Sequence, residues 1–140
     1  MIQVNFYILE ANKQPAAELQ LACRLAEKAL QQQLSAYLYV ATPMIAQQLD
    51  ELLWSFRDTS FVPHGKGDCL PIGIGVGVEP PTQRYQALIN LSQAVVPFHH
   101  QFERIIEIVP AEPNLRKQAR ERYVFYRGLG YQLQSHTLKK

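Results

Sequence analysis

The sequence predicts an α/β fold in a single domain built on a mostly parallel β-sheet. The 140 residues suffice for one domain with a substantial core, but not for two. Short segments rich in β-branched and aromatic residues alternate with longer segments whose apolar residues recur every three or four positions. This β-α-β-α order at the start of the chain favours parallel strands joined by right-handed crossovers.

The first half of the chain contains two predicted strand–helix pairs. Alternating apolar and polar residues predict the first strand, β-forming residues predict the second, and apolar residues three or four apart predict the helices. Thr42 and Pro43 are a typical N-cap and first-turn proline for the second helix. The predicted elements are a strand at 4–8, a helix at 16–33, a strand at 36–40 and a helix that starts at Pro43.

Glycine alternates with β-branched residues from Pro71 to Val78, which predicts a strand with one bare face. The spacing G-x-G-x-G runs into Glu79 and two prolines, whereas the dinucleotide fingerprint G-x-G-x-x-G opens a helix. We therefore expect no nucleotide site here. The bare face instead favours the close approach of another element.

The second half of the chain is expected to add strands around the C-terminal helix. Pro113 suits the first helical position, and Gly128 and Gly130 suit the left-handed conformations that end a helix. Tyr131 and Leu133 favour a further edge strand. The remaining predicted elements are strands at 87–91 and 104–109, a short helix at 95–102 and a helix at 113–127.

The C-terminal helix has two distinct faces when its residues are placed 100° apart. The core side is predicted to hold Leu115, Ala119 and Tyr126, flanked by Phe125, Gln118 and Arg122.

Beside that face, Arg116, Arg120, Tyr123 and Arg127 form one stripe at i, i+4, i+7 and i+11. Like charges at this spacing do not stabilise a helix, and guanidinium groups pair with carboxylate or phosphate. The stripe is therefore either a solvated face or an anion-binding surface.

Large apolar residues gather at the end of the second helix and in the loop that follows. They are Trp54, Phe56, Phe61, Val62 and Pro63. Such a group can form the edge of the core or a docking patch, because Trp and Phe are enriched both in cores and at interfaces. Pattern alone leaves both interpretations open.

No catalytic, metal or cofactor site stands out. Ser60, His64 and Asp68 lie near one another in the sequence but lack the nucleophile-elbow spacing G-x-S-x-G. His99 and His100 are adjacent, so on a helix they would diverge by about 100°. The sequence has no G-x-x-x-x-G-K-[ST] motif for ATP phosphates. We expect a protein that is not an enzyme and holds no cofactor or metal.

Composition is that of an ordinary globular protein, with 47% hydrophobic and 19% charged residues. A net charge of +2 is too small for general attraction to nucleic acid, so an electrostatic partner would meet a local patch. We see neither a signal-peptide pattern nor an apolar run of about 18 residues. The two cysteines lack metal-ligand spacing. We therefore expect a cytoplasmic protein with no membrane partner.

Four blocks of sequence stand out by their order and spacing. They are Asn5-Phe6-Tyr7-Ile8-Leu9, Leu52-Leu53-Trp54, Ser60-Phe61-Val62-Pro63-His64, and Ala119-Arg120-Glu121-Arg122-Tyr123 with Tyr126, Arg127 and Gly130. Together they resemble the chi-subunit family of bacterial DNA polymerase III holoenzyme, nearly end to end. The resemblance implies one chi-like α/β domain over residues 1–140, with a Rossmann-like three-layer fold and no nucleotide-binding motif.

The resemblance also implies a non-catalytic accessory subunit of the clamp-loader complex. In the family, chi pairs one-to-one with the psi subunit, which tethers it to the loader. It also binds the acidic, Phe-terminated C-terminal tail of single-stranded DNA-binding protein. A DNA-repair helicase is a further partner that the resemblance implies.

Two sets of residues carry these roles by position. The implied tail-binding residues are Val109, Arg116, Arg120, Tyr123 and Arg127. Their cations would meet the acidic groups of the tail, while Val109 and Tyr123 would form an apolar slot for the last Phe. The implied psi-docking residues are Trp54, Phe61, Val62 and Pro63. The alternative functions are direct binding of single-stranded nucleic acid through the arginine face, and partnership with a helicase in DNA repair.

Overall fold

The computed structural model describes residues 2–9, 17–55, 65–66, 72–77, 85–92, 94–110 and 112–138. Its elements follow the predicted order, with boundaries that shift by one or a few residues. In chain order they are β1 (Gln3–Leu9), α1 (Ala17–Gln31), β2 (Ala36–Tyr39), α2 (Pro43–Ser55), β3 (Gly65–Lys66), β4 (Ile72–Gly75), β5 (Ala87–Asn90), η1 (His99–Gln101), β6 (Arg104–Val109), α3 (Pro113–Gly128) and β7 (Gln132–Leu138).

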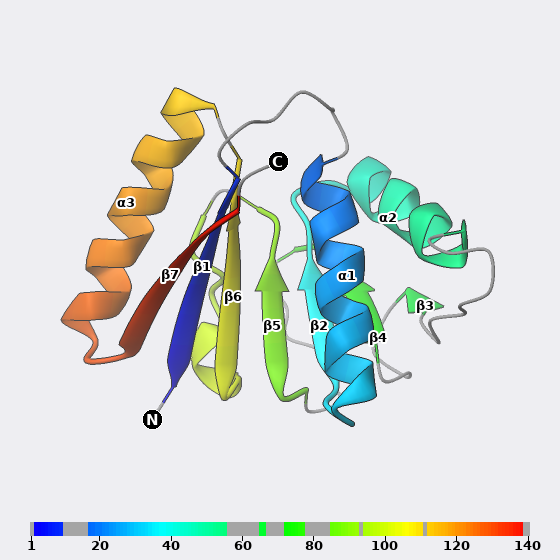
Figure 1. Cartoon of the computed structure of the whole chain (residues 1–140), viewed down its shortest axis with the longest axis horizontal. Coiled ribbons are helices and arrows are strands. Elements are labelled where there is room, and N and C mark those ends of the chain that lie inside the picture. Colours follow the sequence, from blue (N-terminus) through cyan, green and yellow to red (C-terminus); the bar gives the residue numbers. More distant parts are fainter. Residues whose placement is uncertain are drawn as a thin grey trace.

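The strands form one sheet in the order β3-β4-β2-β5-β6-β1-β7, and every neighbouring pair is parallel. The predicted α/β class and parallel sheet are therefore confirmed. β1 and β2 follow each other in sequence, yet β6 and β5 lie between them in the sheet (Figure 1). β7 pairs with β1 at one edge, as the predicted edge strand.

The two faces of the sheet carry separate apolar clusters, so the sheet is the middle of three layers. Side chains from α1 and α2 pack with Leu38, Ile89 and Ile108 on one face. Residues of α3 and of the β5–β6 connection pack with Leu88 and Val109 on the other. Ile108 and Val109 are consecutive, and they point to opposite layers because side chains alternate along a strand. This arrangement confirms the three-layer, Rossmann-like prediction.

The glycine-rich strand is β4, and its bare face is filled by an aromatic side chain. The ring of Tyr37 from neighbouring β2 lies so close to Gly75 that a Cβ there would overlap its hydroxyl. Tyr37 packs in turn against Tyr85, Phe98 and Phe102. The expected close approach is confirmed, and the group that approaches is a ring of the adjacent strand.

Helix ends follow the local signals in most cases. The N–H of Ile45 donates to Oγ1 of Thr42 at 3.2 Å, which confirms the N-cap of α2. Pro113 opens α3 as predicted, and the carboxylate of Glu112 caps that helix. Gly130 has φ +83° and follows the helix end, whereas Gly128 is the last helical residue. The left-handed conformation expected at Gly130 is therefore confirmed, whereas the one expected at Gly128 was wrong, because the helix continues through that residue.

One predicted helix needed correction, and one short strand was missed. The helix predicted at 95–102 is only the short 3₁₀ turn η1, because Val96 and Phe98 are both buried and would lie about 200° apart on an α-helix. β3 was not predicted, since two residues carry no detectable alternation.

On α3, Ala119, Arg122 and Tyr126 are buried, but Phe125 is 44% exposed and Gln118 is exposed. Arg122, which was expected at the flank of the buried face of α3, therefore belongs to that face itself.

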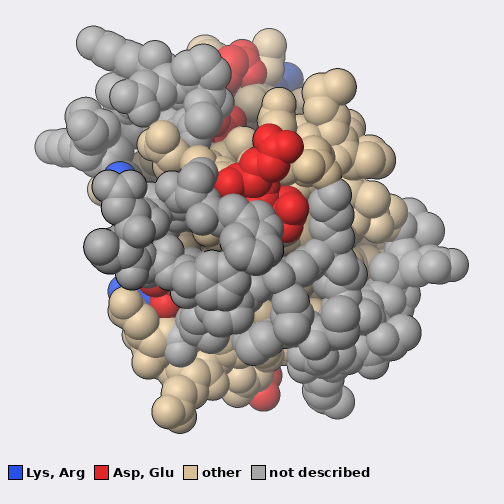
Figure 2. Space-filling view, turned by 90° about the vertical axis from the view of Figure 1, so that its right-hand side faces the viewer, with Lys and Arg blue, Asp and Glu red and all other residues tan. Residues whose placement is uncertain are grey.

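Charged residues are distributed unevenly between α2 and α3, which lie at opposite edges of the sheet. α2 contains Asp50 and Glu51 and no basic residue, and the face at this end shows several acidic side chains among the described residues (Figure 2). α3, at the other end, contains five basic residues and only Glu121 as an acid. None of the helices in the described ranges is both long and apolar enough to cross a membrane.

Candidate functional site

A pocket of about 230 Å³ lies between α3 and the strands beneath it. Four of the five residues implied by the resemblance for tail binding meet here. The lining residues are Phe6, Ile8, Val109, Arg116, Ala119, Arg120, Tyr123 and Ser135. Arg127 continues the stripe along the exposed side of α3 but does not line the pocket.

The floor and one wall of this pocket are apolar. Phe6 and Ile8 are two apart on β1, so they face the same side of the sheet, and Val109 lies beside them on β6. The ring of Tyr123 packs against Phe6, with centroids 5.5 Å apart at 51°. Phe6 and Val109 are each only 3% exposed. The pocket therefore offers a slot that can accept an apolar side chain.

The two arginines beside the slot are held differently. Nη2 of Arg116 donates to the carbonyl oxygen of Leu9 at 2.9 Å, which fixes this guanidinium at the end of β1. Its buried Nε has no hydrogen-bond partner among the residues that the structure describes. Arg120, one turn further along, is exposed and forms no ion pair with any residue in the described ranges. One positioned and one unpaired cation therefore border the apolar slot, and both can donate to an anion.

The pocket lies where the sheet topology favours a ligand. β1 continues into α1 on one face of the sheet, and its neighbour β6 continues into α3 on the other face. In open α/β sheets, ligands bind in the crevice near the carboxyl ends of two such strands. Ile8 and Val109 lie at those ends.

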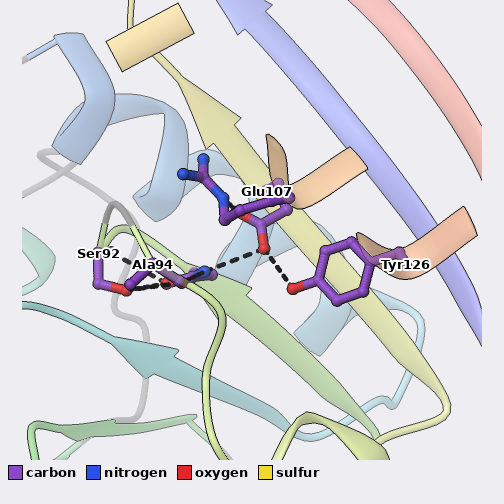
Figure 3. Close-up of polar contacts among 6 residues, drawn as sticks. Ser92, Ala94, Glu107 and Tyr126 are labelled. Atoms are coloured by element: carbon purple, nitrogen blue, oxygen red, sulfur yellow. Dashed lines mark hydrogen bonds and ion pairs between the residues drawn. The ribbon is translucent and has the colours of Figure 1, made fainter. Parts of the chain in front are cut away.

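A buried polar cluster on the same face of the sheet was not predicted. Glu107 is fully buried and accepts three hydrogen bonds: from Arg122 Nε at 3.0 Å, Tyr126 Oη at 2.6 Å and Asn90 Nδ2 at 3.0 Å (Figure 3). Asn90 also donates to the carbonyl oxygen of Ala94 at 2.8 Å and accepts from Ser92 Oγ at 2.6 Å. The cluster fastens α3 to β6 and to the segment after β5.

Burial raises the pKa of Glu107, while Arg122 and the three hydrogen bonds oppose that rise. Burial and the neighbouring carboxylate also raise the pKa of Tyr126, so its hydroxyl stays protonated and donates. The sequence did contain a signal for this cluster. Glu107 stands between Ile106 and Ile108, and the other residues from Ile105 to Val109 are apolar, so a carboxylate there needs a buried partner.

The residues implied for psi docking cannot be placed together. Phe61, Val62 and Pro63 lie outside the described residues. Trp54 belongs to the last turn of α2, but its side chain is also outside what the structure describes. Their role stays a prediction.

The fold and this site define a three-layer α/β protein with a cation-bordered apolar pocket beside its last helix. Residues 1–134 match the family model described as "DNA polymerase III chi subunit, HolC". The chain belongs to this family, and so to the accessory subunits of DNA polymerase III that serve DNA replication.

Curated relatives agree over almost their whole length. DNA polymerase III subunit chi of Pseudomonas aeruginosa is 41% identical, and the match covers 100% of this chain and 99% of the relative. The Haemophilus influenzae subunit is 34% identical, with 96% of both chains covered. The Escherichia coli subunit is 30% identical, with 99% of this chain and 100% of the relative covered.

Proposed function

We propose that this protein is a non-catalytic adaptor of the DNA polymerase III clamp-loader complex. Its pocket beside α3 binds the acidic, Phe-terminated tail of single-stranded DNA-binding protein. The region of Trp54, Phe61, Val62 and Pro63 docks the psi subunit in a 1:1 complex, and psi tethers the protein to the loader. A DNA-repair helicase is a further partner for the docking region.

The observation that carries this proposal is the apolar slot bordered by arginines. An acidic peptide that ends in Phe offers a ring for the slot formed by Val109 and Tyr123. Its Asp side chains and terminal carboxylate can accept hydrogen bonds from Arg116 and Arg120. Size, polarity and charge of the pocket therefore all suit such a tail.

The separation of α2, which contains Trp54, from the pocket beside α3 also supports an adaptor. α2 packs against β3 and β4 at one edge of the sheet, and α3 packs against β6 and β7 at the other (Figure 1). Neighbouring strands lie about 4.8 Å apart, so edges separated by six spacings are roughly 30 Å apart. Two partners can bind at these ends without competing for the same surface.

The test of tail binding compares two cations on the same helix. Arg120→Ala should weaken binding of a synthetic tail peptide at least several-fold, because a hydrogen bond to a charged group contributes roughly 1.5–3 kcal/mol and this one is solvent-screened. Lys117→Ala removes an exposed cation that does not line the pocket and should have much less effect. Affinities from fluorescence anisotropy should fall as salt is added.

Arg127→Ala should also weaken tail binding less than Arg120→Ala, since Arg127 lies beyond the pocket. Equal effects of Arg120→Ala and Lys117→Ala would remove the pocket from the binding site. Bare single-stranded DNA tests the alternative function. Tight binding of the DNA without any partner protein would favour direct recognition of nucleic acid.

Psi docking is tested by Phe61→Ala. The variant should no longer co-purify with psi, while its circular dichroism spectrum and melting temperature stay those of the parent protein. A variant that instead unfolds would assign Phe61 to the core.

A further inference from the structure

The buried guanidinium of Arg122 has hydrogen-bond donors that find no acceptor in the described ranges of the chain. Arg122 is only 3% exposed, and its Nε donates to Glu107. Nη1 and Nη2 are buried and have no hydrogen-bond partner among the described residues. A guanidinium carries five N–H donors, so four remain unsatisfied. Buried donors without an acceptor are rare and costly, which indicates that an acceptor from outside belongs here.

Arg122 lines a second groove, on the opposite side of α3 from the pocket described above. The groove has a volume of about 450 Å³, which falls in the range of small-molecule sites. Its lining residues are Ala94, Val95, Gln118, Glu121, Arg122 and Phe125. The walls include Val95 and Phe125, and Phe125 is 44% exposed although it is a large hydrophobic residue.

The unused edge of Arg122 has a definite chemical preference. Nη1 and Nη2 together present parallel N–H groups that match the two oxygens of one carboxylate. Glu107 is bonded through Nε alone, so that edge is not blocked by the internal ion pair.

We propose that this groove binds a carboxylate carried on an apolar group. Nη1 and Nη2 of Arg122 are buried, so the side chains that cover them move aside when the carboxylate oxygens accept from them, and the apolar group packs between Val95 and Phe125. The carboxylate of Glu121 lies in the same lining and repels an anion, so binding is weak unless that charge is removed. The ligand is either a free carboxylic acid or an acidic side chain of a peptide.

The probe for a free acid is benzoate, titrated into uniformly ¹⁵N-labelled protein and followed by NMR. We expect saturable shifts at the amides of Ala94, Val95, Gln118 and Phe125. Benzamide has the same shape without the charge and should shift them far less. An acetylated, amidated Phe-Glu-Phe peptide represents the peptide source. Tighter binding of the peptide than of benzoate would identify a protein segment as the natural ligand.

Variants at Ala94 provide a matched pair. Its side chain is exposed and only its carbonyl oxygen contacts the polar cluster, so the fold should tolerate substitution. Ala94→Asp places a like charge at the groove and should weaken benzoate binding roughly fivefold, whereas Ala94→Lys should strengthen it. Glu121→Gln should also strengthen it. Arg122→Lys keeps a cation beside Glu107 but removes the paired N–H groups of Nη1 and Nη2. This variant should therefore abolish the shifts that benzoate causes.

Three outcomes would overturn the proposal. The first is the absence of saturable shifts at the groove in the parent protein. The second is an equal response to benzamide, which would mean a purely apolar contact. The third is equal benzoate affinity of Ala94→Asp and Ala94→Lys. The tail-binding pocket lies on the other side of α3, so Arg120→Ala should leave benzoate binding unchanged and separates the two sites.

Discussion

Replacing Tyr126 with Phe removes one oxygen atom from the centre of the buried cluster. That oxygen donates to Glu107 at 2.6 Å, and Tyr126 has no exposed surface. The ring stays, so its packing against Phe6 is kept and no large cavity forms. Glu107 then keeps only the donors of Arg122 and Asn90.

The expected loss of stability follows from leaving one acceptor position of the buried Glu107 carboxyl group without its donor. Removing one partner of a buried hydrogen bond costs roughly 1–3 kcal/mol, so Tyr126→Phe should lower the free energy of unfolding by about 2 kcal/mol. For a chain of this length that corresponds to a melting temperature lower by roughly 6–8 °C.

Urea unfolding at neutral pH measures this loss, and the slope of free energy against urea should not change. Tyr123→Phe is the matched control, since its hydroxyl makes no hydrogen bond to any described residue. The control should alter stability by less than about 0.5 kcal/mol. If both variants lose the same stability, the bond between Tyr126 and Glu107 does not fasten α3 as inferred.

Three further results are expected. Burial raises the pKa of Cys23 to about 12, so native Cys23 should resist iodoacetamide at pH 8 by mass spectrometry, and stability should fall from pH 9 to pH 12 as the unfolded thiol ionises first. Burial and neighbouring His100 lower the pKa of His99, so NMR titration should give a value below 6.5, and stability should fall as pH drops through 6.5. Gly75→Ala should cost about 1–3 kcal/mol in thermal unfolding because its Cβ meets the Tyr37 ring, whereas Gly128→Ala, with open space around it, should not.

Much of the fold and part of the site could be predicted from local patterns. The alternation in β1, the strand β6, the N-cap Thr42, the first-turn proline Pro113 and the edge strand after α3 were all identified from the sequence. The stripe of Arg116, Arg120 and Tyr123 followed from helical spacing alone. Each of these features can be predicted from a single helix or strand. The periodicity of that element, two residues for a strand and 3.6 for a helix, determines which residues share a face.

The sequence by itself thus determined most of the elements, although not β3 or the 3₁₀ turn η1, together with the cationic stripe on α3. Only the tertiary structure decided that β6 and β7 flank β1, which brings Phe6, Val109 and Ser135 against that stripe. It also decided that Glu107 meets Arg122 and that the far edge of Arg122 has no partner within the described part of the chain. The reason is that strand order and the seating of a helix depend on how all the apolar faces pack together, and no local spacing reports that.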